Sequence, residues 1–195
     1  LLGELPSMEA QYQGWLDEHW DDGHQMFHWS GMHDGMEINI ESRQTQNDFD
    51  GGDSYRPTLN SYVYGDLNAI ANTLELAGDS TKAAEYRQKA EALKQRVLQE
   101  LWDPKRQFFI SQFAHDEEKN GYKIKALSLV YQDGKYAGDS HGRELTGYVP
   151  WMFNLPDKNK GYEVAWQGRT DTNVFLAPYG FYFVERHDPQ FLVAQ

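Results

Sequence analysis

The chain has 195 residues, of which 39% are hydrophobic and 14% aromatic, and it carries a formal net charge of -12 with no cysteine. This length and composition suit a globular chain with one ordinary hydrophobic core, not a disordered chain. The negative charge repels phosphate backbones and anionic lipids, so nucleic acid and membranes are excluded as favoured partners, and the lack of cysteine excludes disulfides, thiolate nucleophiles and cysteine-ligated zinc.

The start of the chain shows neither a signal-peptide pattern nor an apolar run near the ~20 residues that a membrane span needs. The first residue is Leu1 and no initiator methionine precedes it, so we expect a processed chain or a fragment. The localisation and the oligomeric state stay open at this point.

A short amphipathic helix is predicted over about residues 7–20, because apolar side chains recur there every three or four residues. Ser7 is the expected N-cap. Asp21, Asp22 and Gly23 then end the helix.

Two long helices are predicted next. The first begins at Pro57, carries one apolar face and ends at Gly78, and the second is capped by Asp79 or Ser80 and runs to about Leu101. A connection of only two residues makes such helices antiparallel, as an αα-hairpin. The first has many Asn and Tyr side chains and reads as an inner helix, whereas the second has the Lys/Glu surface of an outer helix.

Beyond the helices, the segments RQFFISQF (106–113) and KALSLVYQ (125–132) are predicted as short strands of a small β-hairpin, with the charged segment HDEEKNGY (115–122) as the loop between them. A further helix is expected at about 158–168. The predicted fold class is therefore mainly α, with antiparallel αα-hairpins and one small β excursion.

The stretch from His28 to Asp66 concentrates the polar chemistry and is predicted to be a loop that leads into the first long helix. Aromatic side chains are costly on an exposed loop, so their abundance favours a cleft for a polar ligand. The acids of this loop are Asp34, Glu37, Asp48, Asp50 and Asp53.

The pair Asp34 and Glu37 is the first candidate for catalysis. Hydrolysis of a glycosidic bond needs one carboxylic acid that protonates the leaving oxygen and a second carboxylate on the other side of the sugar. Two acids in a glycine-rich loop are also typical of loop solvation or helix capping, and their spacing alone does not decide between these roles.

The segment RELTGYVPW is the second candidate. Here Glu144 can bind sugar hydroxyls and Trp151 can stack on a sugar ring, but an Arg143–Glu144 surface pair beside a buried tryptophan explains the same residues. Glu185, followed by an arginine, poses the same choice.

No metal site and no cofactor are predicted. The histidines at 19, 24, 28 and 33 lie among helix-breaking residues and specify no third ligand. Asp48, Asp50 and Asp53 do not match the EF-hand pattern, because Leu59 stands where that loop needs an acid, and another calcium geometry stays open.

Six segments in this order resemble the six-hairpin glycosidases, above all enzymes of the mannosylglycerate hydrolase type related to glycoside hydrolase family 63 and to trehalases. The segments are HDGMEINI, RPTLNSYVYGD, LWDP with QFF, RELTGYVPWMF, YEVAWQ, and APYG with ERHDPQF. The resemblance implies an (α/α)6 toroid, of which residues 1–195 form a single and incomplete catalytic domain. It also implies that a general-base glutamate follows in further helices.

The family motif, read onto Gly35-Met36-Glu37, implies that Glu37 is the general acid, with Glu where the family has Asp, and that Asp34 binds substrate or tunes Glu37. The implied activity is hydrolysis of an α-linked glycoside, with inversion, and the implied partner is a carbohydrate. A sugar epimerase or lyase that uses His33 and His141 is one alternative, and a non-catalytic carbohydrate-binding module is another. The implied sugar-binding residues are Trp29, Tyr55, Arg56, Asn60, Tyr64, Arg143, Glu144, Tyr148, Trp151 and Glu185.

Overall fold

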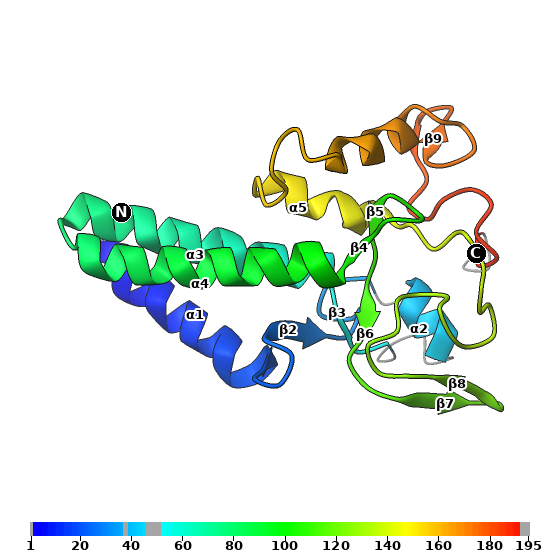
Figure 1. Cartoon of the computed structure of the whole chain (residues 1–195), viewed down its shortest axis with the longest axis horizontal. Helices are drawn as coiled ribbons and strands as arrows, with labels where there is room; N and C mark the ends of the chain where they lie inside the picture. The colour runs from blue at the N-terminus through cyan, green and yellow to red at the C-terminus, as the bar shows by residue number, and fades with distance from the viewer. Residues whose placement is uncertain (1, 37–38, 46–51, 192–195) are drawn as a thin grey trace.

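The structure of the chain, a computed structural model, describes residues 2–36, 39–45 and 52–191. The molecule is elongated: the helices α1, α3 and α4 form one end, and short strands, turns and several short helices form the rest (Figure 1). Mainly helical structure was predicted from the sequence and is confirmed. None of the helices in the described part combines the length and the apolar character needed to cross a bilayer.

The helical end consists of α1, α3 and α4. Gly78 ends α3 in the left-handed conformation, with φ 85°, and Asp79 caps α4 by accepting a hydrogen bond from the backbone of Lys82. These are the predicted boundary residues. The Ser7 cap is wrong, because α1 begins two residues earlier with Pro6 in its first turn, where a missing N–H needs no cap. The bounds are Leu2–Glu4 for η1, Leu5–His19 for α1, Pro57–Ala77 for α3 and Ser80–Glu100 for α4.

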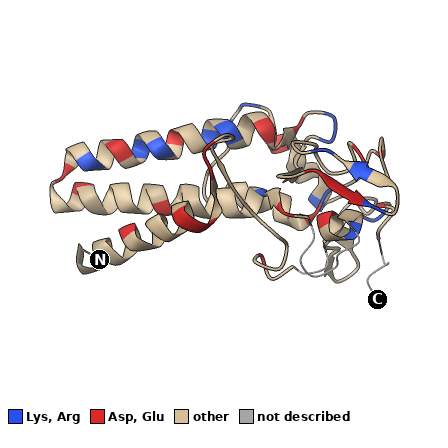
Figure 2. Ribbon diagram, turned by 90° about the horizontal axis from the view of Figure 1, so that it is seen from below, with Lys and Arg blue, Asp and Glu red and all other residues tan. Residues whose placement is uncertain are grey.

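The larger hydrophobic core lies between these helices. Leu59, Val63, Leu67 and Ile70 form one almost fully buried face of α3, and Val97 of α4 is equally buried. α3 contacts both α1 and α4. Figure 2 shows acidic and basic residues alternating along α4, whereas α3 is almost free of charge. This distribution agrees with the predicted inner and outer helices.

A small antiparallel sheet with the strand order β1-β2-β3-β6 joins the helical end to the rest of the chain. His28 pairs with Tyr55, and Ser54 pairs with Phe113. The whole α3–α4 hairpin lies in sequence between the neighbouring strands β3 and β6. The strand bounds are Trp20–Asp21 for β1, Met26–Trp29 for β2, Ser54–Tyr55 for β3 and Gln112–Phe113 for β6.

A short helix, α2 (Ile40–Thr45), interrupts the stretch that was predicted to be loop throughout. Asn39 and Ser42 cap it reciprocally: the Ser42 N–H donates to the Asn39 side chain at 2.9 Å, and the Asn39 N–H donates to the Ser42 hydroxyl at 3.2 Å. The prediction was wrong because the many turn-forming residues hid this local capping signal.

The predicted β-hairpin is also wrong in position. The hairpin β7–β8 lies inside the segment predicted as a charged loop, and 125–132 forms no strand but only the single bridge between Gln112 and Leu129. Asn120 and Gly121, both with positive φ, supply the two-residue turn that selects this hairpin. The bounds are Glu117–Lys119 for β7 and Tyr122–Ile124 for β8, with the pair β4 (Trp102–Asp103) and β5 (Phe108–Phe109) at the base of α4.

The last third of the chain packs over β5 and α3. Phe153, just after α5, lies directly on α3 at Gly65, where an added Cβ would come within 2.3 Å of its ring. The helix predicted at about 158–168 is a 3-10 helix that begins later, because Asn159 and Gly161 have positive φ. The bounds are Leu145–Tyr148 for η2, Val149–Met152 for α5, Tyr162–Arg169 for η3, Leu176–Ala177 for β9 and Gly180–Phe181 for β10.

Candidate active site

A buried arginine, Arg56, organises the polar part of the molecule. It immediately precedes α3 and is only 2% exposed. Its guanidinium lies 3.5 Å from a carboxylate oxygen of Asp34 and 3.5 Å from one of Glu41, and it donates to the side-chain oxygen of Asn39 at 3.3 Å. The loop, α2 and the start of α3 are therefore held together by one cation.

Asp34 is the buried acid of the loop that leads to α2. Its side chain is 2% exposed, and one carboxylate oxygen accepts a hydrogen bond from the Thr58 hydroxyl at 2.8 Å, while the other has no protein partner. Burial raises the pKa of Asp34, although the charge of Arg56 and the Thr58 hydrogen bond act in the opposite direction. A carboxyl group of this kind can bind a ligand hydroxyl or exchange a proton.

A cavity of about 270 Å³ lies beside Asp34. Met36 of the loop, Thr58 and Tyr62 of α3, and Thr146 of η2 line it. The other lining residues are Leu145, Val149 and Phe183. This combination of a mainly apolar wall with a few polar groups is typical of sites for small ligands.

Glu144 adds a third carboxyl group to the surroundings of Arg56. It is 7% exposed and accepts a hydrogen bond from the backbone N–H of Ile40 at 2.8 Å. Burial, followed by the negative charge of Glu41, raises the pKa of Glu144 well above its usual value. One guanidinium thus faces three buried acids, and the raised pKa of Glu144 follows from its burial and from this excess of acidic groups.

Half-buried Arg143 and fully buried Glu185 form a separate ion pair. The Arg143 guanidinium binds one Glu185 oxygen at 2.9 and 3.0 Å, and the Arg143 backbone N–H donates to the other at 2.9 Å. The bridge between Glu144 and Val184 continues this contact. The pair therefore fastens the 143–144 segment to the end of the chain, and it does not line the cavity beside Asp34.

Two of the residues implied to bind sugar have their polar groups bonded inside the protein. The Asn60 amide is fully buried, accepts from the Phe27 N–H and donates to the Phe27 carbonyl, each at 2.9 Å. The Tyr55 side chain is 1% exposed, and its hydroxyl donates to Asp21. Both side chains connect strands and helices of the core.

The remaining aromatic candidates pack against other side chains, and Trp29 also lies close enough to Asp34 to lower the pKa of that carboxyl group. The Tyr148 hydroxyl donates to the Ala165 carbonyl at 2.7 Å, and Trp166 packs against both Tyr148 and Trp151. Tyr64 packs at the margin of the larger core. Trp29 is 8% exposed, stacks on His33 and belongs to the same core.

Thr58 and Tyr62 were missed by the sequence analysis, although they contribute more directly to the cavity than Asn60 and Tyr64. Residues four apart lie on one face of a helix, so the sequence could have shown that Thr58 and Tyr62 share a face, but the contact of Thr58 with Asp34 is tertiary. Tyr62 also borders a second cavity of about 560 Å³ between α1 and α3, where the Trp15 indole donates to Asp66 at 3.1 Å.

Glu37, the acid implied by the family motif, and Asp48 and Asp50 lie outside the described residues. Within the described ranges, one group of side chains has the composition and spacing of metal ligands: His28, Asp53 and His115. It contains Asp53 of the open calcium hypothesis, but with two nitrogen donors beside the carboxylate.

Comparisons with known proteins agree with the motifs quoted above. The model of the family described as "Mannosylglycerate hydrolase MGH1-like glycoside hydrolase domain" matches residues 1–194. A solved structure named "Sialidase" is similar over 100% of this chain, with 31% identity and a TM-score of 0.78. The match covers 15% of that structure's chain, so this chain spans a small part of its length. Among curated proteins, no match was found.

Proposed function

Because the chain belongs to the family of mannosylglycerate hydrolase MGH1-like glycoside hydrolase domains, we propose that its loop 34–37 carries the general acid of a hydrolase that cleaves an α-linked glycoside with inversion. The observation that carries this proposal is the buried carboxyl group of Asp34, which faces a cavity and has one oxygen without a protein partner. Glu37 follows directly on Met36, which lines the same cavity.

In this mechanism Glu37 protonates the leaving oxygen as the glycosidic bond breaks, while a second carboxylate removes a proton from the attacking water on the opposite face of the sugar. No residue of this chain is assigned to that base. Asp34 accepts a hydrogen bond from a sugar hydroxyl, and its negative charge keeps Glu37 protonated to a higher pH. Arg56 and Thr58 hold Asp34 in position for both tasks.

The test compares substrates that need acid assistance with substrates that do not. In the full-length protein, Glu37→Gln should lower kcat/KM on a natural glycoside about 100- to 10,000-fold. On a glycosyl fluoride, whose leaving group needs no proton, the same variant should lose about tenfold at most. Nuclear magnetic resonance of the first-formed product reports inversion directly.

Glu85→Gln is the matched control, since Glu85 is an exposed acid on the outer helix α4, and this variant should keep full activity on both substrates. If Glu37→Gln loses activity equally on both substrates, Glu37 is not the general acid. If Asp34→Asn instead shows the selective loss, the acid is Asp34. Activity of Glu37→Gln within threefold of the unmodified protein on every substrate would remove Glu37 from the mechanism.

A further inference from the structure

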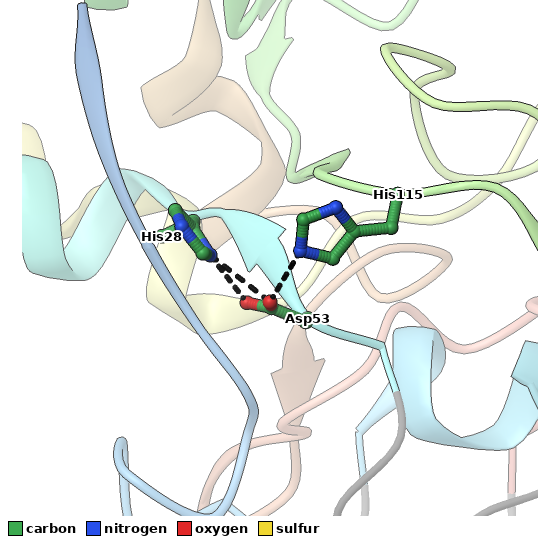
Figure 3. Close-up of side chains that lie close together, drawn as sticks. All are labelled: His28, Asp53 and His115. Carbon is green, nitrogen blue, oxygen red and sulfur yellow. Dashed lines mark hydrogen bonds and ion pairs between the residues drawn. The ribbon is translucent and has the colours of Figure 1, made fainter. Parts of the chain in front are cut away.

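Two histidines converge on one aspartate at the edge of the small sheet (Figure 3). The His28 Nδ1 lies 3.0 Å from the Asp53 carboxylate, and the His115 Nε2 lies 3.1 Å from the same carboxylate. The two imidazole rings are nearly perpendicular, with centroids 5.4 Å apart. The side chains come from segments separated by 25 and 62 residues, so local sequence spacing does not reveal the group.

The sheet register explains why these three residues meet. His28 lies in β2, Asp53 directly precedes β3, and His115 follows β6 by two residues. The backbone pairing extends beyond β3 and β6, because the Ala114 N–H donates to the Asp53 carbonyl at 3.0 Å. Side chains alternate between the faces of a strand, so Asp53 and Tyr55 point to one face while Ser54 and Arg56 point to the other. The Asp53 side chain therefore points away from Arg56, and a bend at 114–115, just after β6, brings His115 to it.

The spacing of the donor atoms suits a small divalent cation. The three ligand atoms all lie within 4.8 Å of one another. In a tetrahedral zinc site with bonds of about 2.0–2.2 Å, ligand atoms are about 3.4 Å apart. The contacts of 3.0 and 3.1 Å to Asp53 thus need to open by only a few tenths of an ångström. The His115 side chain is 62% exposed, which gives an ion access from solvent.

The types of donor atom also favour a cation. Asp53 supplies a carboxylate, and His28 and His115 each direct an imidazole nitrogen to it. Glu117 of β7 is close enough for the charges of His115 and Asp53 to influence its pKa. Two imidazoles and a carboxylate form a ligand set that zinc and similar transition metals accept, whereas calcium prefers oxygen ligands.

We propose that His28, Asp53 and His115 bind a divalent transition-metal ion such as Zn²⁺, with water completing the coordination. His28 lies in β2, and Asp53 and His115 lie just outside β3 and β6, so the ion has a structural role: it fastens the ends of β2, β3 and β6. The site does not depend on the proposed glycosidase activity, and it can be present with or without that activity.

The test is a titration of the tag-free, chelator-treated protein with Zn²⁺, followed by calorimetry at pH 8, because metal ligands bind in their deprotonated forms. We expect one ion to bind, and the melting temperature to rise with Zn²⁺ but not with the same concentration of Ca²⁺. Cobalt replacement should give the visible absorption bands of a site with nitrogen and oxygen donors.

His115→Gln is the key variant, because His115 is largely exposed and its replacement leaves the core untouched. It should weaken Zn²⁺ binding at least a hundredfold and abolish the rise in melting temperature. His187→Gln replaces an exposed histidine outside the group and should bind Zn²⁺ as the unmodified protein does. Asp53→Asn is the second ligand variant, with the same expected loss.

The proposal is overturned if the unmodified protein binds no Zn²⁺ in this titration. It is equally overturned if His115→Gln and Asp53→Asn bind Zn²⁺ with undiminished affinity, because the ion then lies elsewhere. Circular dichroism without metal confirms that each variant is folded.

Discussion

The two ends of this molecule bury different kinds of side chain. The helical end, made of α1, α3 and α4, buries mainly Leu, Ile, Val and Ala side chains, and most charges of α4 lie on its outer face, although Lys94 is buried and paired with Asp157. The opposite end has few regular elements but buries Arg56, Glu41, Glu144, Glu185 and Asp188, each at most 7% exposed. Burial of charge costs free energy unless every charge is paired, so the second end is organised around polar contacts and the first around packing.

Of the substitutions that test this contrast, Arg56→Met should cause the largest loss of stability. The substitution keeps the volume but leaves Asp34, Glu41 and Glu144 without a cation, so the free energy of unfolding should fall by about 3–5 kcal/mol. Urea unfolding measures it.

The control is Arg87→Met on α4, where the arginine binds Glu75 at the surface and should contribute only about 0–1 kcal/mol. If the two substitutions lower the free energy of unfolding equally, the buried ion pairs of Arg56 do not stabilise the protein more than a surface ion pair does.

Asp188 provides a test through pH. Burial raises the pKa of Asp188 to about 6, and Tyr131 donates to it at 2.7 Å. The folded state therefore holds a proton that the unfolded state releases above pH 4, and stability falls as the pH rises from about 4 to 6. The loss amounts to about 3 kcal/mol once the pH exceeds both pKa values.

Asp188→Asn removes this titration, so the difference in urea midpoint between pH 4.5 and pH 7 should change relative to the unmodified protein. Stability should be better maintained at pH 7 in the variant. An identical pH dependence of both proteins would show that Asp188 titrates normally.

Substitution of one glycine in α3 and one in α1 should give the smallest changes in stability, and the two changes compare a packed helix face with an open one. Gly65→Ala places a Cβ within 2.3 Å of the Phe153 ring, and displacement of α5 should cost about 1–3 kcal/mol. Gly14→Ala in α1 meets no atom within 4 Å, and the better helix propensity of alanine should stabilise the protein by about 0.5–1 kcal/mol. Thermal unfolding of both variants should thus give shifts of opposite sign, and shifts of the same sign would contradict the packing of Phe153 on α3.

The same contrast explains what the sequence could predict. The long helices follow from the period of their apolar residues and from Pro57, Gly78 and Asp79, which are signals within a few residues of one another. The burial of Arg56 among acids from three segments depends on tertiary contacts, and no local pattern encodes it. The contacts of Thr58 and Tyr62 lie between these two cases. The sequence predicts that both side chains share one face of α3, but it does not predict that Asp34 lies beside this face.

The motif and the fold are confirmed at the level of the family, whereas the roles of Glu37 and of the implied sugar-binding residues remain predictions. Asn60 shows why the sequence alone does not assign such roles. An asparagine that binds a sugar hydroxyl and one that joins a strand to a helix are identical in sequence, and only the contacts with Phe27 identify the second role.

The insertion of α3 and α4 between the neighbouring strands β3 and β6 has a consequence for the folding pathway. The ends of β3 and β6 are separated by more than fifty residues, and closing so long a flexible loop costs entropy. The antiparallel hairpin returns the chain to its starting point through contacts that are local in sequence, and such contacts form early. We therefore expect the α3–α4 hairpin to form first. Its formation brings Phe113 close to Ser54, so the pairing of β3 with β6 follows as a later step of folding.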